Sequence, residues 1–212
     1  MNQPIILLNG WPGVGKDTVA ETLKLLLGDD KASLVDWSKG QTETFQPLPE
    51  DDPEAHKIQR DACFADQVER PDTLSKIIIC TDCLPDTTEG RRLAQDFEIV
   101  ANRCNRLLIP VYLDCHLDEN MRRIVNAERR VSLKDKIRNP NAARIVRSEG
   151  GKLYAFPRHQ GIAIDNTGKV PHEAALQILT FMRELILRRD EALAHDETTP
   201  MEANEPIWSV RS

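Results

Sequence analysis

The N-terminal segment constrains the fold most, because an apolar run leads directly into a glycine-rich turn and then into an amphipathic stretch. The run "PIILLN" covers residues 4–9, the turn "GWPGVGK" covers residues 10–16, and "TVAETLKLLLG" covers residues 18–28. Drawn as a helix, the last stretch places its apolar side chains on one side and ends at a glycine, a typical stop signal. Its predicted buried side chains are Val19, Leu23, Leu26 and Leu27. Strand, glycine turn and helix in this order predict the first βα unit of an α/β protein.

The glycine turn carries the residue types that bind phosphate. Gly10, Gly15 and Lys16 match the pattern G-x-x-x-x-G-K-[ST], whose backbone N–H groups surround phosphate oxygens while the lysine adds a formal charge. The following helix would add its positive end. The next position normally carries the hydroxyl that serves Mg²⁺, but here it is Asp17, and Thr18 follows. The turn therefore predicts a nucleotide site and leaves open which of these two side chains serves the metal.

Four further apolar runs, separated by helical patterns, predict the rest of a parallel sheet. The runs cover residues 33–37, 76–81, 107–114 and 161–165, and the helical patterns cover residues 87–105, 117–130 and 171–194. Short, nearly continuous apolar runs are typical of strands buried on both faces. Alternating strands and helices indicate right-handed crossovers. Pro110 cannot donate to a ladder, so we expect the fourth strand to begin there or to be irregular.

Two insertions and a tail complete the predicted organisation. We expect one domain over residues 1–195, followed by an acidic, disordered tail over residues 196–212. The polar insertion 38–75 and the basic segment 128–160, which lacks a clear apolar stripe after residue 131, both follow strand ends. Ligands of α/β proteins bind beyond these ends, so the two segments are candidates for acceptor binding and for a lid. Plain surface loops are the alternative.

Charge and composition exclude several classes of function. The net charge is −6, and the residues from 190 onward hold six acids and one base, which leaves about −1 for the rest of the chain. A near-neutral body does not predict nucleic-acid binding. No apolar run approaches a membrane span and no signal peptide is recognisable, so we expect a cytoplasmic protein. Five cysteines, with Cys80 and Cys83 as a lone C-x-x-C pair, predict neither a disulfide framework nor a zinc site.

The loop and three later blocks resemble a known family. "GWPGVGKDTVA" is similar to the adenylate-kinase-type loop G-x-P-G-x-G-K-G-T, in which Pro12, Gly13 and Thr18 match and Asp17 replaces a small residue. "TDCLPDTTEGRRLA", "IPVYLDCHLDENMRRI" and "IDNTGKVPHEAALQIL" resemble segments of the P-loop kinases, which include chloramphenicol-phosphotransferase-like small-molecule kinases. The resemblance covers about residues 3–188. It implies a three-layer α/β/α fold with a five-stranded parallel sheet in the order 2-3-1-4-5.

The resemblance also implies roles for individual residues. The loop would bind ATP, or another NTP, through Gly10, Pro12, Gly13, Val14, Gly15, Lys16, Asp17 and Thr18. Mg²⁺ would be held by Asp17, Thr18 and Asp82, and Asp36 would be the catalytic base. Arg129 and Arg130 would reach over the phosphates, and Asn166, Thr167 and Gly168 would flank the adenine ring. Asp36 and Asp82 can also be read as strand-end residues that bind only backbone groups.

The sequence therefore predicts an ATP-dependent kinase that transfers the γ-phosphoryl group, with Mg²⁺, to a hydroxyl or phosphate of a small-molecule acceptor. A nucleoside or nucleotide kinase, a polynucleotide 5′-hydroxyl kinase and a nucleotide-binding module without transferase activity are the alternatives. The acceptor is not identified, and Glu43, Asp51 and Arg60 are the candidate residues of the insertion expected to shape its pocket. We expect Asp17 to face the metal, because its charge would otherwise repel bound phosphate.

Overall fold

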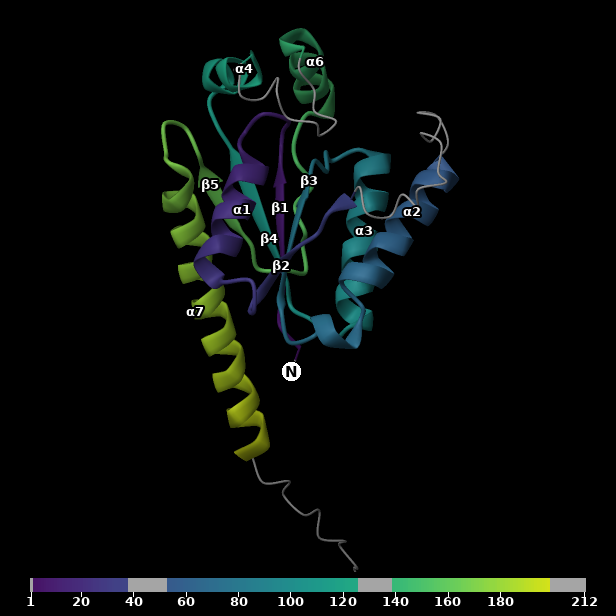
Figure 1. The fold of residues 1–212 in the computed structure, drawn as a ribbon, viewed down its shortest axis with the longest axis vertical. Helices are drawn as coiled ribbons and strands as arrows, with labels where there is room; N and C mark the ends of the chain where they lie inside the picture. The colour runs from purple at the N-terminus through teal and green to yellow at the C-terminus, as the bar shows by residue number, and fades with distance from the viewer. Residues whose placement is uncertain (1, 38–52, 126–138, 199–212) are drawn as a thin grey trace, which may run out of the picture.

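The protein contains a five-stranded, wholly parallel sheet (Figure 1). The computed structural model describes residues 2–37, 53–125 and 139–198. The strands are β1 (Ile5–Gly10), β2 (Ala32–Leu34), β3 (Ile77–Asp82), β4 (Leu108–Asp114) and β5 (Ile162–Asp165). Their order in the sheet is β2-β3-β1-β4-β5. The predicted fold class and strand order are confirmed.

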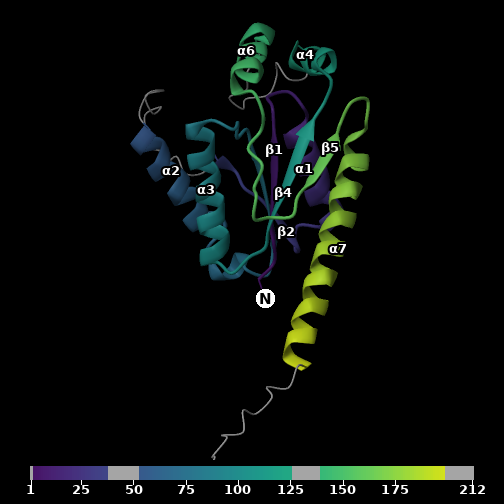
Figure 2. The same ribbon diagram turned by 180° about the vertical axis from the view of Figure 1, so that it is seen from behind.

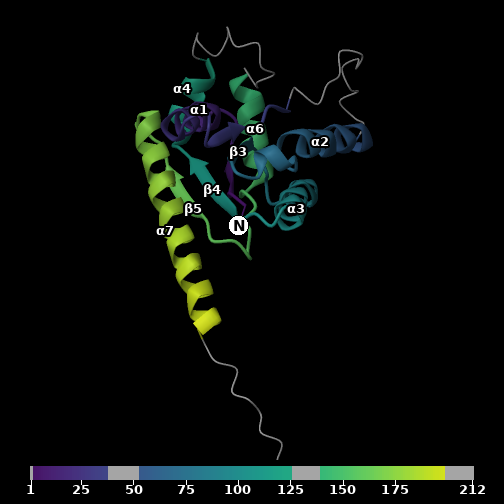
Figure 3. The same cartoon turned by 60° about the horizontal axis from the view of Figure 1, so that its bottom comes forward.

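Helices cover both faces of the sheet and so form the outer two of three layers. The helices are α1 (Lys16–Leu27), α2 (Pro53–Gln67), α3 (Thr88–Arg103), α4 (Leu117–Val125), α6 (Pro140–Gly150) and α7 (Pro171–Thr198), with a short 3₁₀ turn, η2 (Pro71–Thr73). Figure 2 shows α1 and α7 on one side of the sheet and α2 and α3 on the other, and Figure 3 shows the same layers from below. None of the described helices is long and apolar enough to cross a bilayer.

The central strand explains this layering. Alternate residues of β1 point to opposite faces, so Ile6 and Leu8 pack in the cluster that contains α1 and α7, whereas Ile5 and Leu7 pack in the cluster that contains α3. All six residues of β1 are buried. A strand buried on both faces favours apolar side chains on both, which is why residues 5–8 show no alternation.

The sequence expectation for the fourth strand was wrong in detail. Pro110 neither starts nor disrupts the fourth strand: β4 starts at Leu108 and Pro110 pairs in register with Leu7. The ring is tolerated because β5 pairs with β4 only from Val111 onward. Gly161 lies beside the ring, where a Cβ would come within 2.9 Å of the Pro110 Cγ atom.

Two helical expectations also need correction. Leu26 was expected to be buried, but it is 47% exposed, and the buried residues of α1 are Val19, Ala20 and Leu23. The basic segment, in which no apolar stripe was visible, contains α6. The Asn139 side chain caps this helix by accepting hydrogen bonds from two backbone N–H groups, and Pro140 follows in the first turn. Local capping therefore defines α6 although its apolar pattern is weak.

One buried cation ties the amino-terminal edge of the sheet together. The Arg106 side chain, whose residue is only 5% exposed, donates hydrogen bonds to the carbonyl groups of Gln3, Val68, Thr73 and Lys76 at 2.7–3.2 Å. Burial lowers the pKa of this guanidinium, which still remains charged because arginine loses its proton only at extreme pH. The opposite, carboxyl-terminal edge is left for the site, and α4 and α6 lie above it in Figure 1.

Candidate nucleotide-binding site

The turn between β1 and α1 has a backbone that only glycine accommodates readily. Gly13 has φ of +90° and Gly15 has φ of +100°, both in the left-handed region that other residues avoid. A Cβ on Gly10 would lie 2.5 Å from the Leu113 carbonyl oxygen. Gly15 is the N-cap of α1 and Lys16 is its first residue. The glycine spacing read in the sequence therefore reflects three separate geometric requirements.

Lys16 lies over the turn that it follows. Its Nζ atom donates hydrogen bonds to the carbonyl oxygens of Gly10 at 2.7 Å and Trp11 at 3.1 Å. The ammonium group is therefore held at the start of the turn, close to the positive N-terminus of α1. The lysine charge and the helix N-terminus together make the electrostatic potential at the turn positive.

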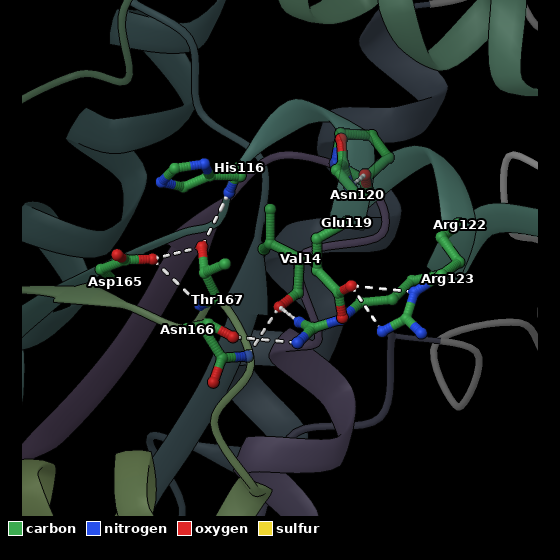
Figure 4. A network of polar contacts seen from close by, with 10 residues as sticks. Val14, His116, Glu119, Asn120, Arg122, Arg123, Asp165, Asn166 and Thr167 are labelled. Carbon is green, nitrogen blue, oxygen red and sulfur yellow. Dashed lines mark hydrogen bonds and ion pairs between the residues drawn. The ribbon is translucent and has the colours of Figure 1, made fainter.

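A network of polar contacts braces the outer side of the turn (Figure 4). Arg123 of α4 donates to the carbonyl oxygens of Val14 and Asn166, both at 2.9 Å, and pairs with Glu119 at 2.7 Å. The Asn166 side chain donates a second hydrogen bond to the Val14 carbonyl at 2.8 Å. The hydrogen bond from Arg123 lowers the pKa of the Glu119 carboxyl. The ion pair is therefore expected to stay charged at neutral pH.

The neighbouring peptide group is braced in the same way. The Asn120 side chain donates to the Pro12 carbonyl at 2.8 Å, and a Cβ on Gly13 would come within 2.6 Å of both Asn120 and Ile124. In a planar trans peptide the N–H points opposite to the C=O. Because the carbonyls of Pro12 and Val14 face α4, the N–H groups of Gly13 and Gly15 face the other way. These N–H groups are the ones that a phosphate would need.

This brace was missed in the sequence. Arg123 is one of many basic residues in its segment, and Asn120 carries no motif. The one available signal was the asparagine in "IDNTGKV", which was assigned to the adenine ring instead. Which arginine of "MRRI" faces the turn depends on how α4 is rotated against it, and no local pattern fixes that rotation.

The predicted adenine-flanking residues follow β5 directly. Asn166 is 3% exposed and contacts the turn, as described above. The Thr167 hydroxyl accepts a hydrogen bond from His116 N at 2.8 Å and donates one to Asp165 at 2.6 Å, which lowers the pKa of that carboxyl. Gly168 has φ of +65°. The structure therefore brings Asn166 to the phosphate turn, while contact of the three residues with a base stays a prediction.

Asp17 and Thr18 point in different directions. The Asp17 carboxylate is half-buried and accepts a hydrogen bond from the Thr81 hydroxyl of β3 at 3.2 Å. Thr18 is exposed, and its carbonyl accepts from Thr22. Within residues 2–37, 53–125 and 139–198, no group of three or more His, Cys, Asp or Glu side chains could hold a metal ion. A cation bound here would therefore take most of its ligands from phosphate and water.

Asp82, the other predicted metal ligand, is engaged by a cation. Its carboxylate pairs with the Arg60 guanidinium at 2.8 Å and accepts a hydrogen bond from Cys83 N at 2.7 Å. Arg60 in turn packs over three aromatic rings, with its Cζ atom 4.7–5.5 Å from the ring centroids of Trp37, Phe64 and Phe97. A metal role for Asp82 stays a prediction, and this ion pair weighs against it.

Arg60 also faces a second acid. Asp96 of α3 lies 3.5 Å from the Arg60 Nε atom, and burial raises the pKa of the Asp96 carboxyl while Arg60 opposes the rise. The Arg60 side chain is 13% exposed, so this cation lies largely within the protein. Arg60 therefore joins the end of β3 to α3.

The predicted base, Asp36, lies two residues beyond β2 and is exposed. Its backbone N–H and C=O both bond to the side-chain amide of Gln67 on α2, at 2.9 Å each. The structure thus fixes the backbone of Asp36, and its role as base stays a prediction. Arg129 and Arg130, predicted to reach over the phosphates, lie outside the described residues.

A cavity of about 730 Å³ opens between the ends of β4 and β5 and the residues that follow α6. It shares one residue, Trp11, with the phosphate turn. Arg147 of α6 lines it and pairs with Asp114 at 3.0 Å. The charged groups of this cavity are thus partly paired with one another.

Comparison with known proteins identifies the fold. No family model and no curated protein matches the chain. Among solved structures, a gluconokinase from Sinorhizobium meliloti is similar with a TM-score of 0.55 at 14% identity, covering 87% of this chain and 93% of that one. The APS kinase of Mycobacterium tuberculosis, in complex with AMPPNP and APS, has a TM-score of 0.54 at 16% identity, covering 86% and 98%.

Shikimate kinase from Aquifex aeolicus is similar with a TM-score of 0.52 at 19% identity, covering 86% of this chain and 98% of that one. These likenesses, together with the parallel sheet order and the glycine turn before α1, show that the chain has the fold of the P-loop small-molecule kinases. At such identities the likeness extends to the fold and not to the substrate.

Proposed function

We propose that the protein is an ATP-dependent kinase that transfers the γ-phosphoryl group to a hydroxyl or phosphate of a small molecule. One observation carries the proposal: in a P-loop kinase fold, side chains of α4 bind the carbonyls of Pro12 and Val14 in the turn before α1, and the Lys16 ammonium group lies against the Gly10 carbonyl at the start of the turn. This arrangement aims backbone N–H groups and positive charge at one point, as phosphate binding requires.

The nucleotide would bind along the carboxyl edge of the sheet. The N–H groups of Gly13 and Gly15 would contact phosphate oxygens, and Lys16 would exchange its two carbonyl partners for the β- and γ-phosphates. Asn166, Thr167 and Gly168 would lie toward the base. Arg129 and Arg130 are the proposed cations over the transferred group.

The donor set of this edge fits Mg²⁺. Carboxylate and hydroxyl oxygens are the hard ligands that Mg²⁺ prefers, and few of them are needed because water and phosphate supply the rest. Asp17 and Thr81 provide one such pair. When bound, Mg²⁺ would neutralise charge on the phosphates during transfer.

The acceptor would lie on the side of β2, α2 and α3. Asp36 would hold the acceptor hydroxyl and take its proton as the oxygen attacks the γ-phosphorus. The Gln67 amide fixes the backbone of Asp36. Replacing Asp36 with Asn should therefore lower transfer far more than ATP binding, and equal losses of both would indicate a structural role.

The central test is Lys16→Ala with ATP and a library of small-molecule acceptors, nucleosides and nucleotides included. We expect the wild type to phosphorylate one acceptor class and Lys16→Ala to lose turnover while its circular dichroism spectrum is unchanged. Lys24→Ala is the matched control, because Lys24 lies on the same helix and pairs with Asp29 near the helix end. Wild-type turnover in Lys16→Ala would refute the proposal.

A nucleotide-binding module without transferase activity is the second candidate. The ion pair of Asp82 with Arg60 favours it, because that pair removes an acid from the edge where the metal would lie. ATP binding by calorimetry without phosphate transfer to any acceptor would support the module over the kinase.

A further inference from the structure

We propose that the phosphate turn and β3 have exchanged the two groups that hold Mg²⁺ in other P-loop proteins. In those proteins a Ser or Thr after the turn lysine and an Asp on a neighbouring strand hold the ion. Here the carboxylate comes from the turn, as Asp17, and the hydroxyl comes from β3, as Thr81. This inference rests on the proposed function and adds the identity of the metal-site residues.

The geometry carries the first part of the inference. The Thr81 hydroxyl donates to Asp17 Oδ1 at 3.2 Å, so the exchanged pair is in direct contact. Thr81 pairs in register with Leu8, two residues before the turn begins at Gly10, so this hydroxyl lies at the carboxyl edge of the sheet. Asp17 lies in the first turn of α1, where the helix dipole favours an anion. A carboxylate can therefore be tolerated next to the phosphate turn.

The surroundings of Asp82 carry the second part. Asp82 is the only partner of Arg60 at hydrogen-bond distance among the described acids, and Asp96 lies farther away at 3.5 Å. The Arg60 side chain is 13% exposed and is enclosed by Trp37, Phe64 and Phe97. Moving the Asp82 carboxylate to a metal would leave a mostly buried guanidinium with weaker compensation, which is costly. Asp17 can serve the metal without breaking this pair.

The exchange has a consequence for binding that does not depend on turnover. A carboxylate beside a triphosphate repels it unless a cation lies between them. Nucleotide affinity in the wild type should therefore fall steeply when the metal is removed. Neutralising Asp17 should weaken the metal but relieve the repulsion, so metal-free nucleotide should bind more tightly than before.

The test uses Mn²⁺ as the probe with AMPPNP and the full-length protein. Free Mn²⁺ is measured by electron paramagnetic resonance, and AMPPNP affinity in EDTA is measured by calorimetry. Thr81→Val should weaken Mn²⁺ binding to the nucleotide complex by about tenfold or more, because loss of even an outer-shell partner typically costs that much, and Asp17→Asn should weaken it further. Asp17→Asn should also tighten AMPPNP binding in EDTA. Glu21→Gln, which removes the same charge one turn farther along α1, should change neither quantity.

A double variant makes the inference falsifiable even if one variant is unstable. Asp17→Thr and Thr81→Asp together restore the usual arrangement, so the double variant should bind Mn²⁺ more tightly than Asp17→Thr alone. Wild-type Mn²⁺ affinity in Asp17→Asn, with a loss in Asp82→Asn instead, would assign the site to Asp82 and overturn the exchange. If the wild type binds no AMPPNP with or without Mn²⁺, the proposed function itself fails, and the exchange fails with it.

Discussion

Replacing Arg123 with Ala tests whether α4 holds the phosphate turn in its binding shape. The substitution removes two hydrogen bonds from a charged donor, to the carbonyls of Val14 and Asn166, and the ion pair with Glu119. Val14 keeps its second donor, the Asn166 side chain. The turn should therefore loosen without losing every contact.

The size of the effect follows from these contacts. A hydrogen bond from a charged group contributes about 1.5–3 kcal/mol to stability, and two such bonds are lost. The Arg123 side chain is 22% exposed and Val14 retains a donor, so water and Asn166 compensate part of the loss. We expect a net loss of about 2 kcal/mol in the free energy of unfolding. For a chain of this length that corresponds to a fall in Tm of about 4–8 °C.

Arg122→Ala is the matched control. Arg122 is the neighbouring residue, pairs with the same Glu119 and is 77% exposed. Exposed pairs contribute about 0–1 kcal/mol, and at about 0.5 kcal/mol for this exposed pair its Tm should fall by about 1–2 °C. The assay is thermal unfolding of the nucleotide-free protein followed by calorimetry with AMPPNP, where only Arg123→Ala should bind more weakly. Equal Tm changes in the two variants would refute the brace.

Three further outcomes are expected. Arg106→Met, measured by urea unfolding, should cost about 3–5 kcal/mol because one buried and three partly buried carbonyls lose their donor; a loss below about 1 kcal/mol would show that water replaces it. Gly13→Ala should abolish AMPPNP binding, since its Cβ would meet Asn120 and Ile124 at 2.6 Å, whereas Gly151→Ala, also at positive φ but in open space, should bind normally. Glu119 has a lowered pKa, so its contribution is present above its usual value of 4.5 and is lost as pH falls through the lowered value. Glu119→Gln should therefore flatten the acid side of the stability–pH curve, and an unchanged slope would contradict the charged pair.

The sequence determined the fold through local rules. Five apolar runs too short for helices, separated by amphipathic segments, left a parallel sheet as the architecture that buries all of them. The glycines before α1 were recognisable because left-handed backbone and close approach exclude other residues, and the structure shows these constraints at Gly10, Gly13 and Gly15. Local patterns succeed here because each depends only on neighbouring residues.

Tertiary structure alone decided which polar side chains meet. Arg123 is 109 residues from Val14, and Asn166 is 152 residues from it, so no spacing in the sequence relates them. Arg122 and Arg123 are adjacent and chemically identical, yet the rotation of α4 gives one to the turn and the other to solvent. Likewise, Asp17 meets Thr81 and Asp82 meets Arg60 only because α1 and α2 pack against β3. Local sequence determines where helices, strands and turns form. Which side chains contact one another depends on how the packed helices and strands are oriented, because rotating a helix about its axis changes the contacts of its side chains without changing the helix itself.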